Sequence, residues 1–160
     1  MRLSPSSSYL RLEHTGERDI PLPTTKLEQV RLLKEWGLDK EPQECIWILA
    51  YDSAMVVQAI VEVGRGTHLS VDLHLPTALA VVLTAGSERF MLIHNHPGGR
   101  AVPSTADLAS TKDVMEAANT LGLYFEDHII LASRGGWFSF AERGQIPTGD
   151  YAEAYKAAST

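Results

Sequence analysis

Three residues, His94, His96 and Asp107, are spaced so that they could bind one metal ion. The two histidines follow the apolar run 90–93, which is typical of a buried strand. Because side chains alternate along a strand, residues at i and i+2 project from the same face, and both imidazoles can reach one ion. A loop rich in proline and glycine follows, and Asp107 would return from the first turn of a helix as a third ligand. Two histidines and one carboxylate, with the fourth position left to water, form a catalytic zinc site.

The rest of the chain contains the strands and helices that such a site requires. Apolar runs predict strands over 44–51, 55–63, 89–94, 123–132 and 137–140. Helical spacing predicts helices over 26–36, 73–85 and 105–121, with a loop over 64–67. In the third helix we expect Leu108, Val114 (or Met115), Ala118 and Leu121 to face inward. This order predicts an α/β fold, a mixed β-sheet flanked by helices, in one domain over 25–146. Residues 1–24 would form an extended N-terminal arm, and residues 147–160 a polar C-terminal tail.

The composition is that of one globular domain and excludes several classes of protein. With 160 residues, of which 44% are hydrophobic, the chain can bury a core of its own. Cys45 is the single cysteine, which excludes an internal disulfide and the P-C-x-x-C signature of the zinc nucleobase deaminases. No apolar run approaches the ~20 residues of a membrane span, and the opening MRLSPSSSYL lacks the apolar core of a secretory signal. We therefore expect a cytoplasmic protein.

The charge of the chain disfavours nucleic acid as its partner. The sequence has 14 Lys and Arg against 20 Asp and Glu, a formal net charge of −6. Duplex-binding domains usually carry a basic patch, because neutralised phosphates supply much of their affinity, and the sequence contains no cluster of Lys and Arg. We expect a peptide or protein partner instead, although the charge alone does not exclude nucleic acid.

The spacing of the histidines, of Ser104 and of Asp107 resembles the JAMM motif of the JAB/MPN metallopeptidases. In that motif H-x-H is followed after seven residues by Ser and after two more by Asp. The longer string HNHPGG…PS..D, which starts at His94, resembles the RadC-like branch of the family, and so does the DHII segment at 127–130. The resemblance covers about residues 25–146.

This resemblance implies the cytidine-deaminase-like α/β fold of JAMM domains and a Zn²⁺ ion held by the two histidines, the aspartate and a water. RadC proteins are traditionally associated with DNA repair and carry an N-terminal helical region, for which residues 1–24 are too short and too rich in proline. The family's basic P-R-E-like segment is also replaced, at 72–76, by Asp-Leu-His-Leu-Pro. Both departures weaken the expectation of DNA contact and leave the substrate class open.

The resemblance also implies roles for residues outside the ligand set. JAMM enzymes use a glutamate that opens an early strand as the general base, and Glu44 matches that position, with Glu62 as the alternative. Ser104 precedes a helix and is suited to cap it, and in JAMM enzymes this hydroxyl also faces the developing oxyanion. For His128 we expect a buried, hydrogen-bonded position, with a supporting role near the zinc as the alternative.

The sequence therefore predicts a zinc metallopeptidase of the JAMM type. In this hypothesis a zinc-bound water, deprotonated by Glu44, attacks a peptide or isopeptide carbonyl. The C-terminal tail of a ubiquitin-like modifier, lying along a sheet edge near His94, is a candidate substrate. The alternatives are a RadC-like DNA-repair or mobile-element accessory protein and a non-catalytic JAB binding module.

Overall fold

The computed structural model describes residues 20–66 and 73–146. Most of the predicted N-terminal arm and the whole predicted C-terminal tail lie outside the described residues. Residues 20–24 belong to the arm and are described; Ile20–Pro21 form the short strand β1, which pairs with a strand of the main sheet. Within the described ranges, no helix is long and apolar enough to cross a membrane.

A single mixed sheet forms the centre of the described structure, as predicted. Its other strands are β2 (Cys45–Tyr51), β3 (Val56–Arg65), β4 (Arg89–His96), β5 (Tyr124–Ala132) and β6 (Trp137–Ser139). Their order across the sheet is β1-β3-β2-β4-β5-β6. β4 and β5 pair in parallel, and the other neighbouring strands pair antiparallel. The parallel pair needs a crossover connection, and a helix between the two strands supplies it.

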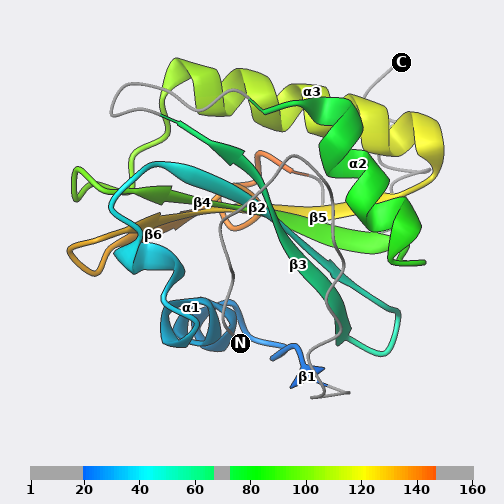
Figure 1. The fold of residues 1–160 in the computed structure, drawn as a ribbon, viewed down its shortest axis with the longest axis horizontal. Helices are drawn as coiled ribbons and strands as arrows, with labels where there is room; N and C mark the ends of the chain where they lie inside the picture. Colours follow the sequence, from blue (N-terminus) through cyan, green and yellow to red (C-terminus); the bar gives the residue numbers. More distant parts are fainter. Residues whose placement is uncertain (1–19, 67–72, 147–160) are drawn as a thin grey trace.

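Helices cover both faces of the sheet, which confirms the predicted flanked architecture (Figure 1). They are α1 (Lys26–Glu35), α2 (Leu75–Thr84) and α3 (Thr105–Leu121), with a short 3-10 helix, η1 (Leu38–Lys40), after α1. α2 and α3 lie on one face and α1 lies on the other. Alternate residues of the central strands separate into two apolar cores: Ile48 and Leu92 belong to the first core, and Leu49 and Met91 to the second.

Two sequence-based expectations about element details were wrong. Leu108 and Leu121 of α3 do not face inward, since they are 47% and 49% exposed. The buried side of α3 carries Val114 and Ala118, as expected, together with Asp107 and Thr111, at helical spacing. The helix is turned so that two polar residues face the sheet near the histidines, and hydrophobic periodicity alone misses a buried polar stripe. The expected loop at 64–67 begins later, because β3 continues through Arg65.

Candidate metal centre

The two histidines of the motif lie side by side at the end of β4. Because they are two residues apart on a strand, both project toward the face that α3 covers. Their ring centroids are 4.7 Å apart, and the ring planes are perpendicular. The His94 side chain is almost completely buried, with 4% exposed, whereas that of His96 is 14% exposed. His96 therefore stands between the buried His94 and solvent.

Asp107 reaches the histidines from the first turn of α3. Its Oδ1 lies 2.9 Å from Nδ1 of His94, and its Oδ2 lies 3.4 Å from Nε2 of His96. Ser104 is the N-cap of α3, as predicted: its hydroxyl accepts from the backbone N–H of Asp107, whose carboxylate accepts from the backbone N–H of Ser104. The Ser104 hydroxyl also donates to Oδ2 at 2.7 Å. The capping box thus fixes the carboxylate that faces both rings.

Glu44 approaches the histidines from the opposite side. β2 and β4 are antiparallel with Ile46 opposite His94, and two further residues along this register bring Glu44 opposite His96. Oε1 of Glu44 lies 3.1 Å from Nε2 of His94 and 3.6 Å from Nε2 of His96. The alternative base, Glu62, lies elsewhere. Both of its carboxylate oxygens accept from Arg65, at 2.7 and 2.6 Å.

Asn95 holds the segment that carries Glu44. Its side chain projects to the opposite face from the histidines and is completely buried. Its Oδ1 accepts from the backbone N–H of Cys45 at 2.7 Å, and its Nδ2 donates to the carbonyl oxygens of Glu41 and Gln43 at 3.1 and 2.9 Å. One side chain between the two histidines therefore fixes the backbone on both sides of Glu44.

The donor atoms of this cluster fit a metal ion. Neither ring nitrogen of His94 forms a hydrogen bond with the described residues, although both are buried and a carboxylate oxygen lies near each. Buried polar nitrogens without a partner are rare, and a bound cation would explain them. One donor atom from each of Glu44, His94 and His96 lies within 4.8 Å of the others, so these three could hold an ion. Imidazole and carboxylate are ligands that zinc accepts.

The protonation state of Asp107 suits a metal ligand, whereas His96 would have to lose its proton before it binds one. Burial opposes the ionisation of Asp107, but the imidazoles of His94 and His96 and the two groups of Ser104 hold the pKa of its carboxyl far below its usual value. Burial likewise opposes charge on His96, but Asp107 and the carbonyl of Arg100 raise its pKa above the usual value. Asp107 therefore stays ionised at a lower pH than an ordinary carboxyl, and at neutral pH a metal can bind without first removing a proton from it.

His128 and Thr111 form a buried polar chain behind Asp107. The Thr111 hydroxyl donates to the backbone oxygen of Asp107 at 2.6 Å and lies 2.7 Å from Nδ1 of His128. Because its single hydrogen is used, the hydroxyl must accept from Nδ1–H, which leaves Nε2 of His128 unprotonated. Burial, with the nearby imidazole of His94, lowers the pKa of His128 to about 3. His128 is thus buried and hydrogen-bonded, and it contacts the site through Thr111.

Sequence reasoning missed Thr111, although a signal for it existed. Thr111 follows Asp107 by four residues, so the two lie on one face of a helix. Apolar periodicity indicates which apolar residues of that helix are buried, but it does not identify the polar residues that share the face of the aspartate. Arg100 was also missed, because nothing in its spacing marks it.

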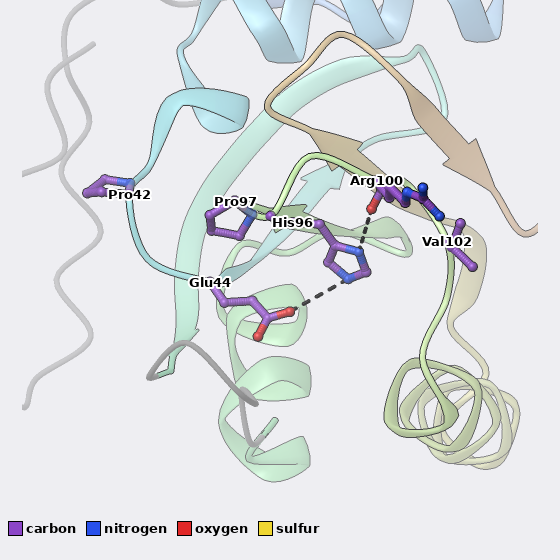
Figure 2. A pocket seen from close by; sticks show the side chains of 7 residues that line it. Pro42, Glu44, His96, Pro97, Arg100 and Val102 are labelled. Carbon is purple, nitrogen blue, oxygen red and sulfur yellow. Dashed lines mark hydrogen bonds and ion pairs between the residues drawn. The ribbon is translucent and has the colours of Figure 1, made fainter.

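A cavity opens beside the histidine that is closer to solvent (Figure 2). It has a volume of about 670 Å³ and is lined by Pro42, Glu44, His96, Pro97, Gly98, Arg100 and Val102. Glu44 lies on one side of His96, and Arg100 and Val102 lie on the other. A substrate in this cavity would therefore contact the base candidate and one of the two histidines at the same time.

Comparisons with known proteins agree with this architecture. Residues 24–145 match the family model of the RadC-like JAB domain. A UPF0758 protein of Porphyromonas gingivalis is 35% identical over 107 residues, which are 66% of this chain and 46% of that protein. A UPF0758 protein of Shewanella pealeana is 36% identical over 109 residues, 68% of this chain and 48% of that protein. The chain spans about half the length of these curated relatives. Since the family match extends over most of the chain and contains the whole candidate site, the chain belongs to the RadC-like JAB domain family.

Proposed function

We propose that this domain is a zinc-dependent hydrolase that cleaves a peptide or isopeptide bond. The observation that supports it best is the convergence of two imidazoles and two carboxylates beside an open cavity, with the nitrogens of His94 left without hydrogen bonds among the described residues. Each of these nitrogens faces a carboxylate oxygen, at 2.9 Å from Asp107 and at 3.1 Å from Glu44, and a bound cation would satisfy all of these groups together.

His94, His96 and Asp107 would hold the zinc ion. The proposal gives the third ligand position to Asp107 because its pKa is far below the usual value and its carboxylate is fixed by Ser104. Glu44, the other candidate, opens onto the cavity and is free to exchange a proton with a bound substrate. When bound, zinc would polarise the scissile carbonyl and lower the pKa of a water from 15.7 to about 7.

Glu44 would move the proton. Its Oε1 accepts a proton from the attacking water as the oxygen–carbon bond forms, and the same oxygen returns that proton to the nitrogen as the carbon–nitrogen bond breaks. The products are one carboxylic acid and one free amine, so the carboxylate of Glu44 is regenerated. Asn95 supports this role by fixing the backbone on both sides of Glu44.

Ser104 would stabilise the developing oxyanion. Its hydroxyl donates to Oδ2 of Asp107, and to reach a substrate oxygen it would have to exchange that acceptor. A donor aimed at the oxyanion is worth roughly 3 kcal/mol of the barrier. As the N-cap of α3, Ser104 would keep its backbone contacts with Asp107 while the hydroxyl turns.

An extended chain is the substrate shape that the sheet can accept. β4 is internal, between β2 and β5, so a substrate cannot pair with it directly. Among the described residues, β3 beyond Val57 pairs only with β2, and its far end lies next to the segment that carries Glu44. A peptide tail, such as that of a ubiquitin-like modifier, could add to this edge through backbone hydrogen bonds.

Metal analysis combined with hydrolysis of quenched peptides and of modifier fusions tests this function. Glu44→Gln should retain zinc and lose about 10²–10⁴-fold in rate, because an amide cannot accept the proton. Glu62→Gln is the matched control and should keep its activity, since Glu62 is paired with Arg65 away from the histidines. If Glu62→Gln abolishes hydrolysis and Glu44→Gln does not, the base has been assigned to the wrong residue.

A further inference from the structure

Arg100 contributes a cation to the wall of the cavity. It lies in the loop between β4 and α3, and its guanidinium makes no ion pair or hydrogen bond with any residue that the structure describes. Arg65, a second cation of this region, differs from Arg100 because it forms ion pairs with Glu62 and Glu41. Figure 2 shows Arg100 beside Val102, on the side of His96 that is away from Glu44.

The loop that carries Arg100 is held in place by its backbone. The carbonyl oxygen of Arg100 lies 3.0 Å from Nδ1 of His96, so the loop and this histidine are positioned together. The carbonyl of Pro97 accepts from the hydroxyl of Ser133 at 3.0 Å. Gly99 has a φ of +91°, a backbone conformation that favours glycine, and a Cβ there would lie 2.9 Å from Cδ of the Arg134 side chain. The Arg100 backbone is therefore fixed relative to His96, while its exposed side chain is left available for a ligand.

We propose that Arg100 binds a carboxylate of the substrate. The assignment rests on the proposed function, because it takes the cavity as the substrate site. A guanidinium presents two parallel N–H donors that match a carboxylate, and such charged pairs are stronger than neutral hydrogen bonds. The carboxylate can come from an Asp or Glu side chain or from the C-terminus of the substrate. Both sources offer the same planar group.

The other charges of the protein disfavour an acidic substrate, so a preference for acidic substrates would depend on Arg100. The chain has a formal net charge of −6, and Glu44 adds a negative group to the same cavity. An acidic substrate is therefore repelled by the molecule as a whole. Within the lining of the cavity, Arg100 is the permanently charged cation, and the other basic group, His96, is proposed to bind the metal. A preference for acidic substrates would have to come from this one side chain.

Binding to the metal-free full chain tests the proposal without any requirement for activity. The probes are two matched pairs: acetyl-aspartyl amide against acetyl-asparaginyl amide, and acetyl-glycyl-alanine against its C-terminal amide. Affinity is measured from NMR shifts of the Arg100 Nε–H and of the loop amides 97–102. We expect the charged probe of at least one pair to bind roughly tenfold more tightly than its neutral partner. The pair that shows this difference tells whether the bound carboxylate comes from a side chain or from the C-terminus of the substrate.

Arg100→Gln should remove the preference, Arg100→Lys should keep part of it, and Arg31→Gln, which removes one positive charge from α1 on the opposite face of the sheet, should change nothing. Equal affinity for charged and neutral probes, or a preference that survives in Arg100→Gln, would overturn the proposal. Tighter binding of inorganic phosphate than of either carboxylate would overturn the carboxylate assignment. A chain that shows the Arg100-dependent preference and yet cleaves no peptide when loaded with zinc would retain the subsite and refute the proposed function.

Discussion

Thr111→Val is the most direct test of the buried hydrogen bonds that connect Asp107, Thr111 and His128 behind the candidate site. Valine has the shape of threonine and the same branching at Cβ, so the substitution removes a hydroxyl and leaves no cavity. Two hydrogen bonds disappear, to the backbone oxygen of Asp107 at 2.6 Å and with Nδ1 of His128 at 2.7 Å. Thr111→Ser keeps both bonds and is the matched control.

The two lost bonds do not cost the same. The carbonyl of Asp107 remains in α3, where the backbone N–H four residues later can still pair with it. The Nδ1–H of His128 has no other partner within the described structure, and His128 is 1% exposed. A buried donor left unsatisfied costs about 1–3 kcal/mol. We therefore expect Thr111→Val to lower the free energy of unfolding by about 2 kcal/mol.

Urea unfolding of the metal-free protein measures this loss, and zinc competition measures its effect on the site. Zinc affinity should fall by roughly tenfold. This is the lower end of the ~10–100-fold loss that is typical when a group supporting a metal ligand is removed, because Thr111 contacts the backbone and not the carboxylate of Asp107. A Thr111→Val protein as stable as the wild type would show that His128 does not donate to Thr111. The tautomer assigned to His128 would then be wrong.

Other predictions follow from the same contacts. The purified wild-type chain should contain close to one zinc, His94→Ala and His96→Ala should lose it, and Asp107→Ala should lose it less completely, as measured by elemental analysis. Asn95→Leu should destabilise the fold by about 3 kcal/mol in urea unfolding, because three buried backbone partners lose their hydrogen bonds. The metal-free protein should lose stability as the pH falls below about 6.5, because the pKa of His128 is about 6.5 in the unfolded chain and is lowered to about 3 in the folded protein. The stability that the neutral His128 contributes is therefore complete above about pH 6.5 and is lost in acid. An unfolding series over pH should show a loss of about 3 kcal/mol at pH 4. Fluorescence anisotropy with a short labelled duplex should show no binding at physiological salt, and tight binding that weakens with salt would instead favour the DNA-repair alternative.

The sequence predicted the elements well and the relative placement of some residues poorly. Strong periodicity and caps were sufficient for α1, α3 and the strands, since Thr25, Ser104 and Gly122 cap the helices as their types suggest. The choice between Glu44 and Glu62 needed the strand register, which single-sequence reasoning does not provide. Only the pairing of Ile46 with His94 brings Glu44 opposite the second histidine.

The orientation of α3 failed for a related reason. Apolar periodicity assumes that buried positions are apolar, and here the site replaces that rule with Asp107 and Thr111 over the first two turns. Leu108 occupies the position next to Asp107 and is pushed outward, because adjacent helical residues lie about 100° apart. The motif thus placed Asp107 beside the two histidines, as the structure has it, and it also implied the orientation of the helix that the hydrophobic pattern missed.

The position of the candidate site follows from the parallel pair that β4 and β5 form among the described strands. β4 and β5 end side by side, with His96 opposite Ala132, and in α/β sheets the carboxyl ends of parallel strands are where ligands bind. The loops that leave these two strands meet there, where Ser133 bonds to the carbonyls of His96 and Pro97 and Arg134 covers Gly99. The strands therefore fix the histidines, whereas the loops form the wall against which a substrate would lie. This division of roles explains why substitutions in the loop should change which substrate binds, while substitutions in β4 should remove the metal.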